Sequence, residues 1–194
     1  MDYRRTEIAE AEVPSTTRPV FQHLVDTYAS ETNKTAATWR ELQDAQLGFR
    51  PHPRSSTVRE ILTHQLLSER RFFAEFIGFP EPPGAELLPA GPEPPVHAYV
   101  ERYVSLARAR LTRLAELDEP RWLEPVPFFD VRRERIWVFW RRVLHTAHHR
   151  TQVGLCLRLL EQQVPPTYGP TADVSWAGAD PTRTVDAAAR KSAG

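Results

Sequence analysis

The residues of this sequence that could do chemistry are histidines near its C-terminal end, in the segment His145-Thr-Ala-His148-His149-Arg150-Thr-Gln152. Two of them, His145 and His149, are four residues apart, and side chains at that spacing lie on one face of a helix. Two imidazoles on one face can bind the same metal ion, and a histidine far upstream, His64, is available to complete the set. The spacing raises the hypothesis of a three-histidine metal site.

The apolar residues around the pair indicate where it points. At about 100° of turn per residue, both histidines fall on the same side of a helix as Val153 and Cys156. We therefore expect the imidazoles to face inward, where two rings without partners would be costly and a bound cation would satisfy both. The alternative is that each ring bonds a backbone carbonyl, a carboxylate or a buried water. His148 lies on the far side of His145 from these apolar residues, so it ranks below His149 as a ligand.

Prolines divide the chain into long segments that must position these residues. The sequence has 18 prolines and only 8 glycines, and the prolines gather in short tracts that end helices. The connection from Gly78 to Pro95 and the loop from Asp118 to Asp130 carry many of them. Four helices without a convincing alternating strand predict an all-α protein, an antiparallel four-helix bundle with long proline-rich connections. The predicted helices run from Thr17 to Asp44, from a cap at Ser55 or Ser56 to Ile77, from Val96 to Leu117, and from Arg132 to Gln163.

His64 lies in the second predicted helix, away from that helix's main apolar side. The apolar stripe is formed by Leu62, Leu66, Phe73 and Phe76, and His64 sits nearly opposite. From this helix alone, His64 is expected to be exposed or to line a groove. Only a bundle that covers the helix on two sides would bring His64 to an ion.

The composition is that of one soluble domain with a sizeable core. The 194 residues are 41% hydrophobic, and 25 Lys and Arg balance 25 Asp and Glu. With a formal charge of zero, the chain has no excess of basic residues of the kind expected in a nucleic-acid-binding protein. The arginine pair Arg141-Arg142 alternates with apolar residues and is interpreted as the solvated side of a helix. Without a signal peptide or the roughly 18 apolar residues needed to cross a bilayer, and with a single cysteine, the chain is expected to be cytoplasmic and not membrane-bound.

The predicted domain organisation has three parts. Residues 1–15 form an N-terminal arm, residues 16–166 form the helical bundle, and residues 167–194 form a C-terminal extension. Residues 168–176 are expected to pack against the body, whereas residues 179–194 are rich in Ala, Thr and Asp and are expected to be disordered. Exposed aromatic surface on a small bundle predicts a homodimer.

The order and separation of the three histidines resemble those of the DinB/YfiT-like family, the DinB superfamily of metal-binding four-helix proteins. The resemblance rests on Val58-x-Glu60-Ile-Leu-x-His64 in the second predicted helix and on His145-x-x-x-His149-Arg150-x-Gln152 in the fourth. It covers roughly residues 17–164. The resemblance implies that His64, His145 and His149 are the three metal ligands and that His148 is a bystander.

Three neutral imidazoles leave positions open on a divalent ion, which is typical of a catalytic site. The ion keeps its full charge and would lower the pKa of a bound water or thiol. Imidazole accepts zinc, nickel, iron and manganese, with zinc or nickel preferred. The resemblance implies thiol chemistry, so we expect a metal-dependent S-transferase that joins a low-molecular-weight thiol to a small electrophile. The alternatives are a noncatalytic stress-response or binding protein with a structural metal, and a helical interaction module without metal.

Three neighbours of the pair have their own expected roles. Gln152 shares the inward side with His145 and is expected to bond a water on the ion or to orient a ring. Arg150 could hold a carboxylate of a thiol cofactor, but its position faces away from the triad, and a surface arginine is the alternative. Cys156 lies two turns beyond His149 and is interpreted as a small buried hydrophobe.

Overall fold

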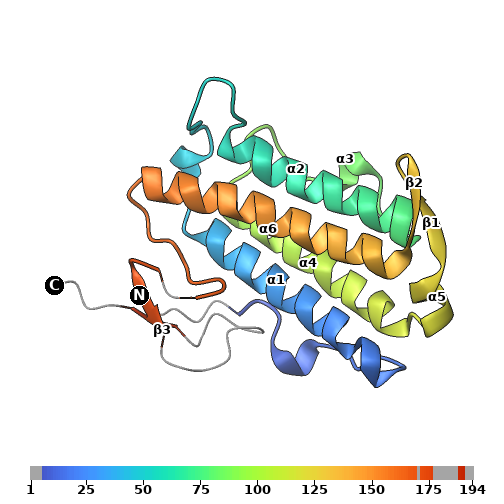
Figure 1. Cartoon of the computed structure of the whole chain (residues 1–194). Helices are drawn as coiled ribbons and strands as arrows, with labels where there is room; N and C mark the ends of the chain where they lie inside the picture. The colour runs from blue at the N-terminus through green and yellow to red at the C-terminus, as the bar shows by residue number, and fades with distance from the viewer. Residues whose placement is uncertain (1–5, 170, 177–187, 191–194) are drawn as a thin grey trace.

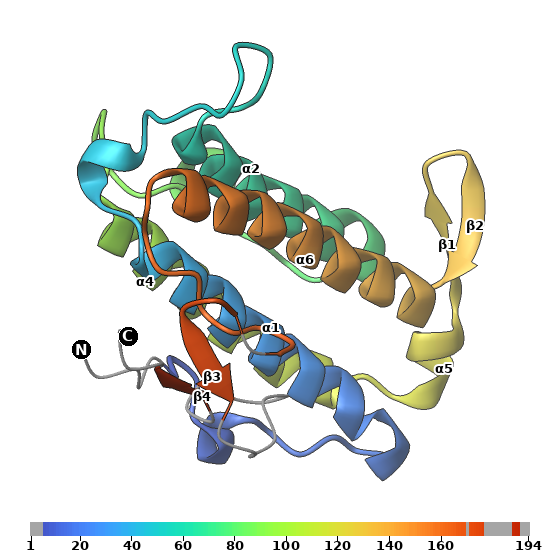
Figure 2. The same ribbon diagram turned by 60° about the vertical axis from the view of Figure 1, so that its left-hand side comes forward.

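A computed structural model of the chain describes residues 6–169, 171–176 and 188–190. This part is mostly helical, and four long helices lie side by side (Figures 1 and 2). They are α1 (Gln22–Arg40), α2 (Val58–Arg71), α4 (Val96–Glu116) and α6 (Arg135–Leu159). The prediction of a helical protein is therefore confirmed. Among the helices of the described residues, none combines the length and the hydrophobicity of a membrane-spanning segment.

Helix α2, which carries His64, has clear signals at both ends. The Thr57 side chain accepts the backbone N–H of Glu60 at 3.2 Å, and the Glu60 carboxylate accepts the N–H of Thr57 at 2.7 Å, a reciprocal capping box. The predicted cap, Ser55 or Ser56, is one or two residues too early. The helix continues into a π-helical turn, η4 (Phe72–Ile77), and ends at Gly78, whose φ of 84° suits glycine.

The other long helices are shorter than their sequence patterns predicted. Helix α1 is preceded by the 3-10 turn η2 (Pro19–Phe21) and followed by another, η3 (Asp44–Gln46), so the predicted range of 17–44 was too long. The N-terminal segment adds the 3-10 turn η1 (Glu10–Glu12). Helix α6 begins at Arg135, because residues 131–134 belong to a strand.

Two short antiparallel strand pairs mean that the strictly all-α prediction is not confirmed. Strand β1 (Pro125–Phe128) pairs antiparallel with β2 (Val131–Glu134), and Phe129 makes the turn with a positive φ of 53°. Strand β3 (Val174–Trp176) pairs antiparallel with β4 (Ala188–Arg190). Two short helices, α3 (Gly84–Leu87) and α5 (Glu119–Leu123), fall within the proline-rich connections.

The pairs α1/α4 and α2/α6 run antiparallel, as predicted. At one end of the first pair Thr17 donates its N–H to the carbonyl of Ala115, and at the other end Val96 donates to Asp44. In the second pair, the Gln65 amide donates to Thr146 at 2.9 Å, one turn from where Arg142 reaches Ser68 at 3.0 Å. The second pair sets His64 level with the histidines of α6.

The pairs α1/α6 and α2/α4 run parallel, which corrects the prediction of a wholly antiparallel arrangement. His23 stacks on Trp140 at the start of α1 and α6, and Glu31 pairs with Arg150 further along both. The physical reason is the long connection over residues 78–95, which returns to the end where α2 began, so α4 starts beside the start of α2 (Figure 2).

The core lies between the long helices and contains charged residues as well as apolar ones. Its buried carboxylate and guanidinium residues include Glu31, Glu69, Arg110, Arg135, Arg142 and Arg150. Buried charges of this kind must be paired, and their pairing bears directly on the histidines. The largest fully buried aromatic side chains are Trp39, Trp122, Tyr103, Phe73 and Phe139.

The start of the C-terminal extension packs against the helices. The Tyr168 hydroxyl donates to Glu31 Oε2 and accepts from Arg150 Nη2, both at 2.6 Å. The predicted disorder of residues 179–194 falls outside the described residues apart from β4 at 188–190. The predicted domain boundaries after residues 15 and 166 stay a prediction.

Candidate metal centre

The three predicted ligands come together between α2 and α6. The ring centroids of His145 and His149 are 4.5 Å apart, those of His64 and His149 are 4.6 Å apart, and those of His64 and His145 are 5.4 Å apart. One nitrogen of each ring lies within 4.8 Å of the other two. Two nitrogens on one ion lie at most about 4.2 Å apart, twice the usual bond of about 2.1 Å. Only a small movement of the rings is needed to close them on an ion.

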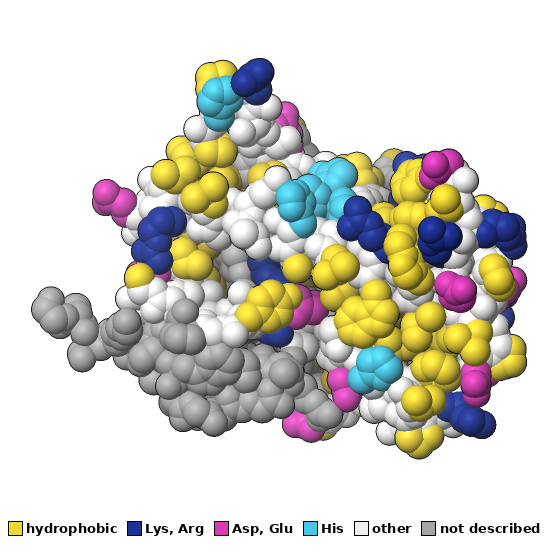
Figure 3. Space-filling view, viewed as in Figure 1, with side chains coloured by type: hydrophobic (Ala, Val, Ile, Leu, Met, Phe, Trp, Pro, Cys, Tyr) yellow, Lys and Arg dark blue, Asp and Glu magenta, His cyan; other side chains and the backbone are white. Residues whose placement is uncertain are grey.

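The three histidines lie at the surface, not deep in the interior. His64 is exposed, and His145 and His149 are half-buried. Figure 3 shows histidine side chains gathered on the face where α2 and α6 lie side by side. The position of His64 opposite the apolar stripe of α2 is therefore compatible with a shared site, because the site lies in the groove between two helices. The predicted inward orientation of the pair on α6 is only partly right.

Burial and mutual repulsion keep the three rings neutral. Burial, with the Arg142 guanidinium and the other histidines, lowers the pKa of His145 to about 3. Burial also lowers the pKa of His64 and of His149 below the ordinary value. Neutral imidazoles have a lone pair to offer, so the donor set fits a divalent transition-metal ion.

His149 is oriented by Gln152, one turn later in α6. The Gln152 side-chain oxygen lies 2.7 Å from His149 Nδ1. This contact is the kind that we expected of Gln152, a hydrogen bond that orients a histidine ring. His148 is exposed, with its ring centroid 5.1 Å from that of His149, and it is outside the group of three.

His145 contacts a buried arginine that the sequence pattern had placed in solvent. Arg142 is 1% exposed, and its Nη1 lies 3.1 Å from His145 Nδ1 and 3.0 Å from Ser68 Oγ. Its Nη2 donates to Thr146 at 2.9 Å and lies 3.7 Å from Glu69. The interpretation of Arg142 as part of a solvated helix face is wrong, because the carboxylate that allows its burial comes from α2.

Glu69 links this arginine to a second one. Its Oε1 accepts the Tyr28 hydroxyl at 2.5 Å and lies 3.4 Å from Arg110 Nη1. Arg110 in turn donates to both oxygens of Glu81, at 3.0 and 2.6 Å. Two buried carboxylates thus balance two buried guanidinium groups, and one of these, Arg142, contacts His145. Glu69 lies on the same helix as His64, but its spacing alone carried no signal of this network.

Arg150 is not brought to the histidines. It is 4% exposed, and its Nη1 lies 2.8 Å from Glu31 Oε2 on α1, while Nη2 donates to Tyr168. Its predicted direction, away from the triad, is correct. It is a buried ion-pair partner, however, and neither a surface arginine nor a group facing the histidine groove.

A pocket of about 300 Å³ opens beside the histidines. It is bounded by His64, His149 and Gln152 on one side and by Ser55 and Ser56 of the 51–56 loop on another. Its other lining residues are apolar or uncharged at neutral pH: Pro51, Ile61, Leu155 and Cys156. The thiol of Cys156 is buried, which raises its pKa, so it remains protonated and apolar as predicted.

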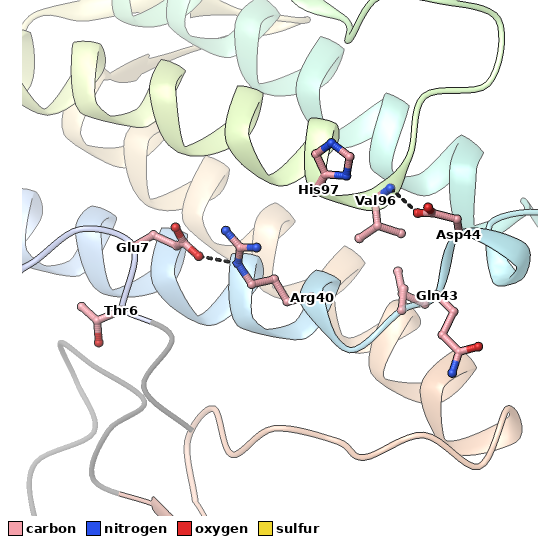
Figure 4. A pocket seen from close by; sticks show the side chains of 8 residues that line it. Thr6, Glu7, Arg40, Gln43, Asp44, Val96 and His97 are labelled. Atoms are coloured by element: carbon pink, nitrogen blue, oxygen red, sulfur yellow. Dashed lines mark hydrogen bonds and ion pairs between the residues drawn. The ribbon is translucent and has the colours of Figure 1, made fainter. Parts of the chain in front are cut away.

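A larger pocket, of about 660 Å³, lies away from the histidines, between the N-terminal segment, the end of α1 and the start of α4 (Figure 4). Its charged side chains hold the fold together. Glu7 pairs with Arg40, and Asp44 accepts the N–H of Val96 at 2.8 Å. Size alone would favour this pocket, but the smaller one is lined by two of the three clustered histidines.

Comparisons with known proteins agree with this architecture. A sequence model of the DinB superfamily matches residues 27–153. The crystal structure of a DinB-like protein from Bacillus cereus ATCC 10987 is similar with a TM-score of 0.60 and 18% identity, over 75% of this chain and 95% of that one. The DinB-like protein YjoA from Bacillus subtilis is similar with a TM-score of 0.58 and 16% identity, over 75% and 97% of the two chains. No functionally curated protein matches the sequence.

Proposed function

This chain belongs to the DinB superfamily, and we propose that it is a four-helix-bundle metalloprotein whose His64, His145 and His149 bind one divalent transition-metal ion. We further propose that the ion serves S-transfer from a low-molecular-weight thiol to a small electrophile. Zinc or nickel is the preferred ion, and iron or manganese would suit the same ligands.

The observation that carries the proposal is the convergence of three neutral imidazoles from two helices within 4.8 Å. Two of them, His145 and His149, follow from helical spacing, but the third comes from α2 and depends on the tertiary fold. Neutral nitrogen ligands leave the charge of the ion undiminished, so a bound cation would stabilise a thiolate relative to a thiol. Half-exposed ligands next to a pocket also suit an ion with open positions.

We place the reactants in the pocket beside the histidines. Ile61 and Leu155 give it apolar walls, while Ser55, Ser56 and Gln152 offer hydrogen bonds. In a substitution, the thiol sulfur forms a bond to carbon, and the bond from that carbon to the leaving group breaks with its electron pair. The thiol proton passes to solvent at the open side of the groove.

The contacts between α2 and α6 favour a catalytic over a structural ion. These helices are already joined by the hydrogen bond from Gln65 to Thr146, at 2.9 Å, and by the contacts of Arg142 with Ser68 and Glu69. An ion is therefore not needed to hold them together. In the structural alternative, loss of the ion would separate them and lower the melting temperature sharply.

The test compares His149→Ala with His148→Ala, two adjacent histidines of which only the first is a proposed ligand. Metal content would be measured after purification without a tag, together with thiol conjugation to an electrophilic aromatic substrate. We expect His149→Ala to lose stoichiometric metal and activity while keeping the wild-type helical circular dichroism, and His148→Ala to keep both. Equal metal content in the two variants would contradict the proposed ligands.

The homodimer, the cytoplasmic location and the absence of nucleic-acid and membrane partners belong to the same proposal. Their support is a formal charge of zero in the sequence and, in the structure, exposed aromatic residues such as Trp137, which is 40% exposed.

A further inference from the structure

Two of the proposed ligands differ in what their Nδ1 atom meets. His149 Nδ1 lies 2.7 Å from the Gln152 side-chain oxygen, and His145 Nδ1 lies 3.1 Å from Arg142 Nη1. An amide oxygen only accepts hydrogen bonds, and a guanidinium only donates them. The two neighbours therefore impose opposite tautomers on rings that are one helical turn apart.

His149 is in the tautomer that suits metal binding. Its Nδ1 must carry the proton, because it donates to the amide oxygen of Gln152. The lone pair is then on Nε2, free for an ion. A metal-bound histidine usually donates its second N–H to such an acceptor.

His145 is in the opposite state. Its Nδ1 lone pair accepts the hydrogen bond from Arg142, so in a neutral ring the single proton is on Nε2. One nitrogen is occupied by a donor and the other by hydrogen. Whichever nitrogen faces the ion, the neutral ring has no lone pair available while Arg142 remains in contact.

We propose that Arg142 is a positioning residue whose hydrogen bond occupies the only lone pair of the neutral His145 ring and so opposes cation binding by that ring. This inference rests on the proposed function of the triad as a metal site. A divalent cation would be bound first by His64 and His149, and His145 would join when its hydrogen bond with Arg142 breaks. With Nδ1 as the ligand atom, His145 keeps its Nε2 proton; with Nε2 as the ligand atom, it loses that proton to solvent and gains one at Nδ1, so in either case its charge does not change.

Arg142 has other partners that allow this release. After leaving His145, Nη1 keeps the Ser68 hydroxyl at 3.0 Å, and Nη2 keeps Thr146 at 2.9 Å. The carboxylate of Glu69, 3.7 Å from Nη2, still compensates the charge. The buried guanidinium of Arg142 therefore keeps its other partners. The exchange replaces its hydrogen bond to His145 with a bond between His145 and the metal ion. His145 is half-buried at the groove, where water can exchange the proton.

The first test reads the tautomers directly in the full-length, metal-free wild-type chain. Nitrogen-15 chemical shifts distinguish a protonated ring nitrogen from one with a lone pair. We expect His145 as the Nε2–H tautomer and His149 as the Nδ1–H tautomer. A metal-free chain in which His145 is protonated on Nδ1 would overturn the proposal, and this test needs no variant to fold.

The second test is a zinc titration of Arg142→Lys, with Arg141→Lys as the matched control. Lysine keeps the charge, but it is shorter and has one nitrogen where arginine has two, so it does not reproduce the contacts of Nη1 with His145 and of Nη2 with Glu69 together. The exposed Arg141 undergoes the same change one residue away. We expect Arg142→Lys to bind zinc about tenfold more tightly than wild type, the factor expected for loss of one competing hydrogen bond. The control should match wild type.

The outcomes separate this inference from the function it rests on. If wild type binds zinc through the histidines and Arg142→Lys binds it equally or more weakly, Arg142 supports coordination instead of opposing it. That result overturns the inference and leaves the metal site intact. If neither protein binds zinc at the histidines, as judged against His149→Ala, both the inference and the proposed function fail.

Discussion

Replacement of Glu69 by glutamine tests the buried charge network beneath the histidines. The Glu69 side chain is 0% exposed and lies between Arg110, at 3.4 Å, and Arg142, at 3.7 Å. Glutamine keeps the shape and can still accept from Tyr28, but it removes the negative charge. Arg110 retains its pair with Glu81, whereas Arg142 loses the only carboxylate within 4 Å of it among the described residues.

The expected loss of stability is large because a buried cation is left without its partner. Breaking a buried pair in this way costs about 3–5 kcal/mol, and the lower end applies here because the amide keeps the hydrogen-bonding shape. For a chain of this size, a loss of about 3 kcal/mol lowers the melting temperature by roughly 6–12 °C. The measurements are urea unfolding and thermal circular dichroism of the metal-free chain, which avoid a contribution from bound ion.

The matched control is Glu75→Gln, the same chemical change in an ion pair at the surface. Glu75 lies 2.9 Å from Arg71, and both side chains are about half exposed. Such a pair contributes about 0.3–0.5 kcal/mol. If Glu69→Gln destabilises the chain no more than Glu75→Gln does, the reasoning that the buried network is electrostatically balanced by Glu69 is refuted.

Three smaller perturbations test other contacts. Tyr168→Phe removes the hydroxyl that bridges Glu31 and Arg150, and we expect urea unfolding to show a loss of about 1 kcal/mol; wild-type stability would argue against packing of the C-terminal segment. Burial raises the pKa of Glu31, but Arg150 and a nearby lysine outweigh it and hold that pKa below its usual value. The resulting stability is present at neutral pH and is lost as pH falls through the folded-state pKa of Glu31. Glu31→Gln should therefore reduce the decrease in unfolding free energy between neutral and acidic pH. An unchanged pH dependence of the unfolding free energy would contradict this. Gln152→Leu should weaken zinc binding about tenfold in a chelator competition, as expected for loss of an orienting partner, while the exposed Gln163→Leu should not.

The positions of the four long helices could be predicted because prolines and apolar periodicity act locally. Gly78 ends the helical segment of α2 and η4 where predicted, since a left-handed φ of 84° is easily adopted only by glycine. The β1–β2 hairpin was missed for a related reason. Pro125 and Pro127 argue against a strand in general, but in a two-stranded edge hairpin their missing N–H groups cost little. The Arg-Arg-Glu run at 132–134 also fitted a helix equally well.

In the candidate site as well, features within one helix could be predicted, and contacts between helices could not. His145 and His149 follow from spacing within one helix, whereas His64 was only a candidate until the resemblance assigned it to the site. Its own helix placed it away from the core, and the site proved to lie at the surface between helices. The burial of Arg142 could not be predicted, because its carboxylate partner Glu69 is on another helix. The residue periodicity of α6 does not show which side chains α2 brings against it.

The central claim is that one divalent ion is held by nitrogens of His64, His145 and His149. Its most direct test is anomalous diffraction, at the zinc absorption edge, from crystals of the full chain grown with zinc. The account predicts one strong peak about 2.1 Å from a ring nitrogen of each of the three histidines. The absence of a peak between α2 and α6, or a peak bound by His148 without His64, would contradict it.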